Sequence, residues 1–461
     1  MIGLKVSTSS FRDPSGFIFE RDGVLYRQIN SGFQKDLELL VDSGLQEELQ
    51  RDGLVVPFQV VDLEIAASTE AAAVIEPERI PFISYPYEWS FSQLKDAALL
   101  TLEIMRRALG KGLALKDASA YNIQFVGTRP VLIDTLSFEA YNEGSPWVAY
   151  KQFCQHFLAP LALMSHVDIR LSSLLQTNID GIPLDLAAHL LPGKTKFQPG
   201  LLTHIHLHAK SQTNTGNPSE KKISISKTSL LALIDNLKGT VSGLQWKPDG
   251  TEWADYYSDT NYSKEGFVAK GKLVSDFLGQ VSSDVKTCWD LGANNGEFSR
   301  LALDKGLKTV AWDIDPAAVE KAYLSCKANK REDLLPLLQD LRNPSTNLGW
   351  GGKERDSLTA RGPAGVLLAL ALVHHLAIGN NVPLSMIASF FAEIGEWLVI
   401  EFVPKEDSQV QRMLVARKDI FIEYHEEGFE QAFGKSFDLV AKQPIEGTCR
   451  TLYLFRRTER P

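Results

Sequence analysis

The second half of the chain alternates between short apolar runs and segments with helical periodicity. From Asp284 onward the apolar runs are VKTCWDL, TVAWDI, the region around Leu335 to Leu341, VLLALAL and WLVIEFV. Strands that are apolar on both faces and separated by helices indicate a parallel sheet that is covered on its two sides. This pattern predicts a doubly wound, Rossmann-like α/β domain over residues 281–461.

The first 208 residues show a different pattern and predict an α+β domain. FIFERDGVLYRQI has the character of a two-stranded hairpin with its turn at Asp22–Gly23, and VVPFQVVDLEI predicts a further strand. Apolar positions recur at helical spacing over 35–48 and over 91–109. Strands and helices that occur in separate runs are typical of the α+β class.

Residues 209–280 lie between these two predicted domains. KSQTNTGNPSEKK, at 210–222, has no periodicity and contains glycine and proline, so it predicts a linker, whereas SLLALIDNLKGTVSGL has helical spacing. WADYYSDTNY, at 253–262, has two interpretations. Either it folds over a ligand pocket and closes it against water, or its aromatic side chains pack as part of the linker.

The first strand-to-helix turn of the α/β domain reads DLGANNGEFS, at 290–299. In a doubly wound sheet, this turn is where a nucleotide-like ligand sits. Gly292 and Gly296 let the backbone turn tightly and approach a ligand without an intervening Cβ. Asn294 stands between them, and asparagine is the non-glycine residue that best tolerates the left-handed conformation. The sequence therefore predicts a ligand-binding loop here.

The second strand ends in TVAWDID, about 20 residues beyond the loop. An acidic residue at this position accepts hydrogen bonds from ribose hydroxyls. We choose Asp313 over Asp315, because Asp313 directly follows the apolar strand residues. Pro316 then suits the first turn of the next helix.

DLGANNGEFS and VAWDIDPAAVEKAY together resemble the first two motifs of class I S-adenosylmethionine-dependent methyltransferases. The resemblance extends from about Val281 to Phe455. It implies S-adenosylmethionine as the cofactor, with the loop facing its amino-acid end, the strand-two acid on ribose and a polar residue after strand three on adenine. The cofactor-binding residues implied are Asp290, Gly292, Asn294, Gly296, Asp313 and Asp340.

A dinucleotide cofactor is the alternative for this loop. The three-glycine G-x-G-x-x-G pattern, which lets pyrophosphate sit on a helix N-terminus, is missing, and Glu297 would place negative charge near that phosphate. The loop therefore favours the methyl donor over a nicotinamide or flavin dinucleotide.

Two candidate catalytic residues follow later strands. Strand four ends at His374 and His375, and His375 has an ordinary pKa near 6.5 that suits a proton acceptor. The alternative is that these histidines shape the pocket or cap the strand. Glu401, at the end of strand five, is expected beside the substrate opening, or else as a solvated charge at its rim. No N-P-P-[Y/F] follows strand four, which argues against methylation of DNA adenine or glutamine.

A second candidate site lies in KDASAYNIQFVGTRPVLIDTLSFE, at 116–139. The spacing of Asp117, Asn122 and Asp134 resembles protein kinases and aminoglycoside phosphotransferases, over about Phe17 to Leu171. That resemblance implies that Asp117 orients a hydroxyl nucleophile and that Asn122 and Asp134 hold magnesium.

The same segment departs from these families at three points. It has no glycine-rich phosphate loop, Arg27 stands nearest the place of the ATP-binding lysine, and Thr135–Leu136 follow the last aspartate. These departures remove much of the electrostatic stabilisation that phosphoryl transfer needs. We therefore expect a degenerate kinase-like domain that binds or supports rather than phosphorylates.

A histidine cluster, His204, His206 and His208, would share one face if LLTHIHLHA were a strand. On a helix, only His204 and His208 would align. No carboxylate or cysteine lies near in the sequence, so we expect no metal site.

Composition narrows the class of protein further. A formal charge of −9 over 461 residues argues against coating nucleic acid and favours a small-molecule, glycan or protein acceptor. Four scattered cysteines fit a reducing compartment, and the start lacks a signal-peptide core, so we expect a cytoplasmic protein without a membrane span.

The leading hypothesis is a methyltransferase with a kinase-like accessory module. The alternatives are a magnesium- and ATP-dependent phosphotransferase or dual enzyme, and a scaffold that binds the methyl donor without turnover. Asn294, where a third glycine is common, keeps the scaffold alternative open.

Overall fold

The computed structural model describes residues 3–213, 224–251, 262–415 and 418–458. These residues form two compact units, 1–247 with 348–355, and 248–347 with 356–461. Most of the predicted polar linker, from residue 214, lies outside the described residues. The aromatic segment lies outside them as well, apart from Tyr262.

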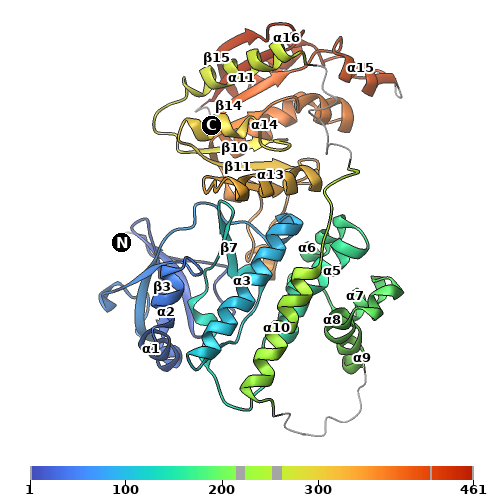
Figure 1. The fold of residues 1–461 in the computed structure, drawn as a ribbon. Coiled ribbons are helices and arrows are strands. Elements are labelled where there is room, and N and C mark those ends of the chain that lie inside the picture. The colour runs from blue at the N-terminus through green and yellow to red at the C-terminus, as the bar shows by residue number, and fades with distance from the viewer. Residues whose placement is uncertain (1–2, 214–223, 252–261, 416–417, 459–461) are drawn as a thin grey trace. The chain divides into compact units, whose positions relative to one another are not determined.

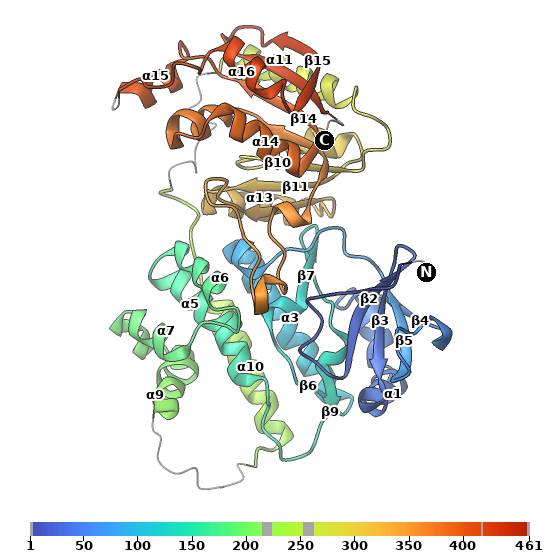
Figure 2. The same cartoon turned by 180° about the vertical axis from the view of Figure 1, so that it is seen from behind.

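The first unit begins with a five-stranded antiparallel sheet in the order β1-β2-β3-β5-β4 (Figure 2). The predicted hairpin is confirmed: its turn residues Asp22 and Gly23 have φ of 54° and 81°, which a tight two-residue turn requires. The strands are β1 (Lys5–Val6), β2 (Gly16–Arg21), β3 (Val24–Asn30), β4 (Phe58–Val61) and β5 (Ala71–Pro77).

Between β3 and β4 the predicted helix over 35–48 is broken in two. α1 (Gln34–Asp42) and α2 (Leu45–Arg51) are separated by Gly44, whose φ is 72°. A glycine adopts this left-handed conformation without the steric cost that a side chain would add. The helical periodicity continues across the break, so the apolar pattern alone does not mark it.

The long helix predicted over 91–109 is confirmed as α3 (Phe91–Gly110). Ser90 and Gln93 form a reciprocal capping box at its start. Two small antiparallel pairs follow it, β6 with β9 and β7 with β8. These strands are β6 (Leu113–Leu115), β7 (Ile123–Val126), β8 (Arg129–Leu132) and β9 (Phe138–Ala140).

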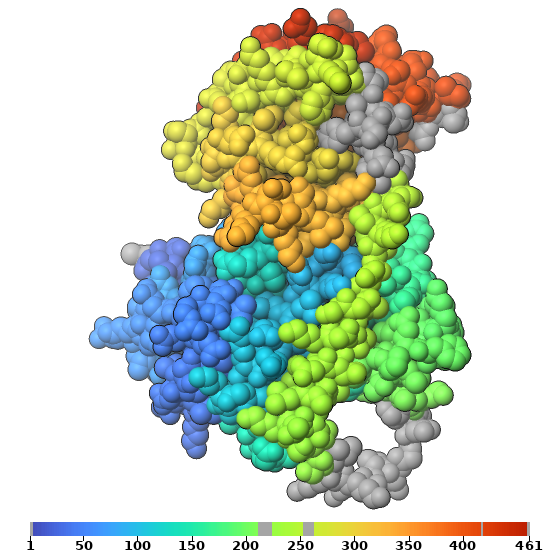
Figure 3. All heavy atoms as spheres, viewed as in Figure 1, coloured from blue at the N-terminus to red at the C-terminus, as the bar shows by residue number. Residues whose placement is uncertain are grey.

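The remainder of the first unit is helical. α10 lies across the unit's surface, with α5, α7 and α9 on its other side from the strands, as Figures 2 and 3 show. The helices are α4 (Tyr150–Phe153), α5 (Ala159–His166), α6 (Leu174–Thr177), α7 (Leu184–Leu190), α8 (Pro199–Leu201), α9 (His208–Thr213) and α10 (Lys227–Gly243), with π-helical segments η6 (Cys154–Leu158) and η9 (Leu202–Leu207).

The expected end of the first domain at residue 208 needs correction, because α10 also belongs to this unit. Lys95 on α3 donates hydrogen bonds to the carbonyls of Ser242 and Leu244, each at 2.8 Å. Lys238 pairs with Glu103 of α3 at 3.2 Å. Packing and these contacts place the helix with α3 rather than in a free linker.

The second unit contains a seven-stranded sheet in the order β12-β11-β10-β13-β14-β16-β15 (Figure 1). The five predicted strands are confirmed and run parallel, while β16 pairs antiparallel with both neighbours. The strands are β10 (Thr287–Leu291), β11 (Lys308–Asp313), β12 (Leu334–Leu338), β13 (Ala364–Ala369), β14 (Gly395–Phe402), β15 (Phe437–Pro444) and β16 (Thr451–Arg457).

Helices cover both faces of this sheet because successive strands are added first on one side of β10 and then on the other. α11 packs with α12, and α14 packs with α16. Right-handed connections place the helices on opposite faces once the strand order reverses between β12 and β13. The helices are α11 (Lys264–Leu278), α12 (Ser299–Asp304), α13 (Pro316–Ala328), α14 (Leu384–Ile394), α15 (Ser408–Val415) and α16 (Glu426–Phe433).

The reversal places β10 and β13 side by side with their connections leaving in opposite directions. Such a switch point opens a crevice at the carboxyl ends of the two strands, and ligands bind there in open α/β sheets. The loop at 290–299 follows β10, and the histidine pair follows β13. Within the described residues, no helix is both long and apolar enough to cross a membrane.

Replacing Gly395 with alanine is expected to destabilise the second unit by about 1–3 kcal/mol. The added Cβ would lie 2.3 Å from Cγ of the fully buried Leu367 on β13, so the sheet must shift. Calorimetric melting would show this as a lower transition temperature.

Gly271 in α11 serves as the matched control, since its added Cβ meets nothing within 4 Å. Gly271→Ala should raise stability by up to about 1 kcal/mol through helix propensity. Equal effects of the two substitutions would contradict this account of the packing.

Candidate active site

The loop after β10 has the backbone conformation that its residues predicted. Gly292, Asn294 and Gly296 all have positive φ, of 74°, 50° and 78°. The prediction that Asn294 takes a left-handed conformation is therefore confirmed. The amides of Gly292 and Ala293 both donate to the carbonyl of Trp312 at 2.9 Å, which ties the loop to β11.

Asp313 strengthens this connection between the loop and β11. Its carboxylate accepts hydrogen bonds from the amides of Asn294, at 2.7 Å, and Asp315, at 2.8 Å. Burial raises the pKa of Asp313 to about 6, although these amide donors oppose the shift. The structure thus brings together the predicted loop and the predicted strand-two acid.

Asp290 lies beneath the loop. Its side chain is almost fully buried and accepts a hydrogen bond from Ser299 Oγ at 2.6 Å. Burial raises the pKa of Asp290 to about 7, while Ser299 and the charge of Lys270 lower it. This position supports the loop and the start of α12 from below, and the predicted contact with a cofactor stays a prediction.

Asp340 follows β12, the strand next to β11. It forms a bidentate ion pair with Arg342, with both N–O distances at 2.9 Å. Burial raises the pKa of Asp340, but the hydrogen bonds and charge of Arg342 outweigh burial and hold that pKa below its usual range. The neighbouring Gln339 is buried, and its amide donates to the carbonyl of Asp313 at 2.8 Å. Asp340 therefore lies beside the strand-two acid, and its contact with adenine stays a prediction.

The segment after β13 reaches the same crevice from the other side. A Cβ on Gly292 would lie 3.3 Å from Leu372 Cδ1, so the glycine permits this close approach. Ala371 has φ of 52°, a conformation that costs energy in residues with a side chain and that clusters at functional sites.

His374 and His375 follow directly, with their ring centroids 4.2 Å apart. His374 is buried, and burial lowers its pKa well below the ordinary value. Burial, together with the positive charge of Arg450, lowers the pKa of His375 to about 4. Both imidazoles are therefore neutral at pH 7 and able to accept a hydrogen bond, but His375 is a weaker base than the ordinary pKa near 6.5 predicted.

Glu401 requires a correction, because it is neither a rim charge nor open to a substrate. Its side chain is fully buried near the end of β14. It pairs with Lys270 at 2.7 Å and with Arg450 at 3.1 Å. Burial favours the neutral acid, but these two cations outweigh it and leave the pKa of Glu401 lowered.

The ion pairs extend to a fourth charge. Arg450 also contacts Asp407, at 2.8 and 3.2 Å, and its guanidinium lies 4.5 Å from the ring centroid of Tyr262. Tyr262 in turn hydrogen-bonds to Glu401. We call this set the buried ion cluster: Lys270, Glu401, Asp407 and Arg450, with the ring of Tyr262.

Sequence reasoning missed most of this cluster. Lys270 lies on the buried stripe of α11, in line with Gly266 and Val274. A lysine within the apolar stripe of an amphipathic helix is a signal that could have found it. Arg450 and Asp407 lie in short connections, where no periodicity marks burial.

Two polar atoms at the crevice lack a hydrogen-bond partner among the described residues. Asn295 Oδ1 and His374 Nδ1 are both buried and unpaired. Buried polar atoms are almost always satisfied by protein, water or a ligand. These atoms, the glycine loop and the Asp313 carboxylate form a set that fits a ligand with amino and hydroxyl groups.

The first unit brings together its three predicted acidic and amide residues. Asn122 Nδ2 donates to Ser137 Oγ at 3.1 Å, and Ser137 Oγ donates to Asp134 at 2.5 Å. Burial and the nearby Asp134 raise the pKa of Asp117. The other oxygen of Asp134 pairs with Arg27, the residue nearest the expected lysine position.

The three histidines of the cluster lie in helical segments, not on a strand. His204 hydrogen-bonds to Tyr150 and Asn236, each at 2.7 Å, and His206 to Thr195 at 2.8 Å. No group of three acidic, histidine or cysteine residues that could hold a metal occurs in the described parts of the chain.

Comparison with known proteins places the chain in a family. It is 37% identical over 460 residues to nodulation protein NoeA of Rhizobium meliloti (strain 1021), covering 98% of this chain and 96% of that protein. The chain belongs to the NoeA family. No protein-family model matches it.

Solved structures with lower similarity include three methyltransferases. Magnesium protoporphyrin IX methyltransferase from Synechocystis PCC 6803 is 17% identical with a TM-score of 0.32, over 45% of this chain and 93% of its own. NodS from Bradyrhizobium japonicum WM9 is 13% identical with a TM-score of 0.30, over 43% of this chain and 99% of its own. The bifunctional kinase-methyltransferase WbdD is 14% identical with a TM-score of 0.32, over 44% of this chain and 41% of its own. Scores of this size do not establish a common fold, so the function of this NoeA-family chain is argued from its site.

Asp290→Asn is expected to flatten the pH dependence of stability between pH 4 and 7. The folded-state pKa of Asp290 is raised to about 7, so the native state holds a proton that the unfolded chain releases near pH 4. Unfolding free energy is therefore lost as pH rises, by up to about 1.4 kcal/mol per pH unit relative to the variant.

The measurement is urea denaturation of both proteins at several pH values. Asp304→Asn, an exposed acid on α12, is the control and should leave the pH profile unchanged. Parallel profiles for the native protein and Asp290→Asn would show that Asp290 is not a buried, protonated acid.

Proposed function

We propose that this chain is an S-adenosylmethionine-dependent methyltransferase whose site lies at the β10–β13 switch point. The observation that carries the proposal is the coupling of the loop at 292–296 to Asp313 by the Asn294 amide, at 2.7 Å. The loop thereby lies next to a carboxylate at the end of β11, and Gly292 and Gly296 carry no Cβ that would keep a ligand away from it. A carboxylate at the end of the second strand is placed to accept the ribose hydroxyls of a nucleoside.

The residues of the site fit this cofactor part by part. Asp313 would accept the ribose hydroxyls, and the loop backbone with Asn295 Oδ1 would face the amino-acid end. Gln339 and Asp340, after β12, would border the adenine. When bound, S-adenosylmethionine supplies a methyl group on a positively charged sulfur.

A dinucleotide fits the same loop less well. α12 begins only at Ser299, whose hydroxyl is already bonded to Asp290, and Glu297 stands just before it. A pyrophosphate needs free amides and positive potential at a helix N-terminus. Here Glu297, a negative side chain paired with Arg300, precedes the helix, so the site favours a cofactor without phosphate.

His375 is our candidate proton acceptor. It is neutral at pH 7, follows the strained residue Ala371, and stands on the opposite side of the switch point from the loop. A neutral imidazole can accept the hydrogen bond of an attacking hydroxyl or amine and take its proton as the methyl group is transferred, although a pKa of about 4 makes this imidazole a weak base. Glu401 is assigned instead to positioning, since its charge is held by Lys270 and Arg450. These features favour catalysis over a scaffold, with a small molecule, glycan or protein as acceptor.

S-adenosylhomocysteine is expected to bind the native protein, and Asp313→Asn is expected to bind it at least tenfold more weakly. Removing the carboxylate charge weakens hydrogen bonds from ribose, and tenfold corresponds to about 1.4 kcal/mol. Isothermal titration calorimetry measures both affinities.

Asp304→Asn, with the same chemical change at an exposed position, is the matched control and should bind normally. A melting curve of each variant separates loss of binding from loss of folding. The absence of binding by the native protein at millimolar ligand would reject the methyltransferase proposal. Binding without transfer to any tested acceptor would favour the scaffold alternative.

The first unit is a kinase-like module that does not transfer phosphate. Its sheet, the long helix α3 and the cluster of Asp117, Asn122 and Asp134 support the likeness. Phosphoryl transfer needs an aspartate that is free to hold magnesium. Asp134 is instead engaged at both oxygens, by Arg27 and by Ser137, so a metal would have to displace an ion pair.

ATP with magnesium is therefore expected not to bind the native protein in a calorimetric titration at about 1 mM, because Arg27 already neutralises Asp134. The competing phosphotransferase hypothesis makes the opposite prediction. It requires magnesium-dependent ATP binding that Asp134→Ala abolishes while the melting temperature of the second unit stays unchanged.

A further inference from the structure

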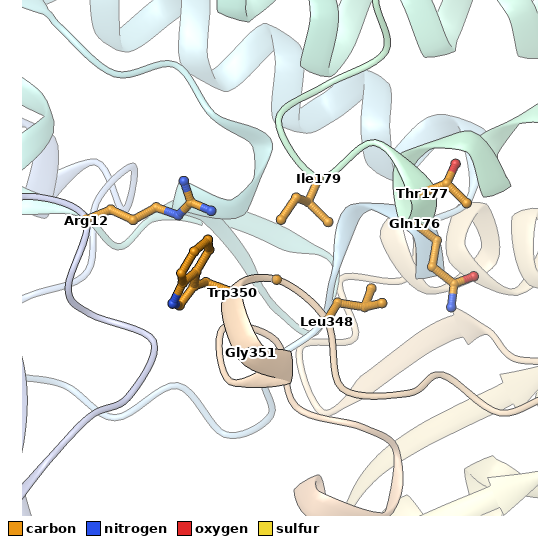
Figure 4. A pocket seen from close by; sticks show the side chains of 8 residues that line it. Arg12, Gln176, Thr177, Ile179, Leu348, Trp350 and Gly351 are labelled. Atoms are coloured by element: carbon orange, nitrogen blue, oxygen red, sulfur yellow. The ribbon is translucent and has the colours of Figure 1, made fainter.

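The first unit contains a pocket of about 650 Å³ that the proposed methyl transfer does not use. Figure 4 shows its side chains: Trp350 beside Arg12, with Ile179 and Leu348 along the pocket and Gln176 and Thr177 at its other end. The volume lies within the range of about 300–1,000 Å³ that is typical of small-ligand sites.

Trp350 exposes most of its indole in this pocket, with 78% of its surface accessible. A large aromatic side chain left in water carries an unfavourable hydration cost, and such exposed apolar surface commonly marks a binding site. The ring is therefore available as a flat apolar platform.

The segment that carries Trp350 is held firmly by the residues around it. Glu354 is buried and accepts the Trp350 amide at 2.6 Å, while Arg12 binds the same carboxylate with two hydrogen bonds, at 2.7 and 2.8 Å. Gly349 has φ of 82°, and a Cβ there would lie 2.5 Å from Glu354 Cβ. The close packing of the turn on Glu354 thus depends on this glycine.

The single charge in the lining of the pocket is balanced by a neighbouring carboxylate. Arg12 is the only lining residue that carries a charge, and Glu354 already occupies two donors of its guanidinium. The paired lining therefore has no net charge to attract an anion, and it offers no carboxylate to a cation. The pocket is therefore complementary to a neutral ligand.

The remaining lining groups provide hydrogen bonds. The side-chain amide of Gln176 has no hydrogen bond to another residue in the described parts of the chain. The Thr177 hydroxyl already donates to the carbonyl of Leu174 and accepts from Asn178 Nδ2, each at 3.2 Å. The Gln176 amide, which can donate and accept at once, is therefore the main polar group of the lining. A sugar ring matches this set, because its C–H face meets the negative face of an indole and its hydroxyls meet amide and hydroxyl groups.

We infer that this pocket is a binding site for a neutral carbohydrate, with Trp350 as the stacking platform and Gln176 as a hydrogen-bonding anchor. This function is independent of methyl transfer, because every residue involved belongs to the first unit. The site recognises a glycan by shape and hydroxyl pattern, without a contribution from net charge.

The test is calorimetric titration of the full chain, without methyl donor, with three neutral probes: maltotriose, cellotriose and N,N′,N″-triacetylchitotriose. At least one is expected to bind. Trp350→Ala should weaken that binding by about tenfold or more, and Gln176→Ala by about fivefold. Because Trp350 is exposed, its replacement should leave the melting temperature unchanged.

Phe197→Ala is the matched control, since Phe197 is an exposed aromatic side chain of the same unit that does not line the pocket. It should bind the trisaccharide normally. Failure of all three probes at about 10 mM, or binding that Trp350→Ala leaves intact, would overturn the inference. Tighter binding of glucose 6-phosphate than of every neutral probe would also overturn it, because it would assign the pocket to anions.

Discussion

The buried ion cluster is the interaction on which the second unit depends. Lys270 comes from α11, Glu401 from β14, Asp407 from the segment after that strand, and Arg450 from the residue before β16. Two acids and two bases leave no net charge, which is what permits their burial. Removing one member would leave an uncompensated buried charge, at a cost of about 3–5 kcal/mol. The cluster therefore fixes a helix, two strands and a connection against one another.

The same cluster sets the electrostatics of the candidate site. Arg450 lowers the pKa of both histidines after β13, and Lys270 lowers that of Asp290 beneath the loop. Burial also lowers the pKa of the histidines, whereas it raises the pKa of Asp290. The result is a crevice with neutral imidazoles on one side and the glycine loop on the other.

In the first unit, three polar residues that the sequence singled out as a candidate site are engaged with one another and with neighbouring side chains. Asp117, Asn122 and Asp134 come together as their spacing predicts, but Arg27 and Ser137 occupy Asp134. Both oxygens of the Asp134 carboxylate are thereby engaged within the protein. Trp350, by contrast, has an exposed side chain that contributes little packing, and Glu354 holds its backbone at the surface.

The sequence alone determined the elements and the loop. Apolar runs marked the five parallel strands, and the residues of the loop indicated the left-handed conformation at Asn294, because these properties depend on near neighbours. Only the tertiary structure decided which charges are buried and how they are paired. Glu401 was expected at an open rim, yet its partner Arg450 is 49 residues away in the chain. Likewise, 348–355 belongs to the first unit although it lies between strands of the second. Desolvation and ion pairing depend on segments that packing brings together, and no local pattern of residues records that packing.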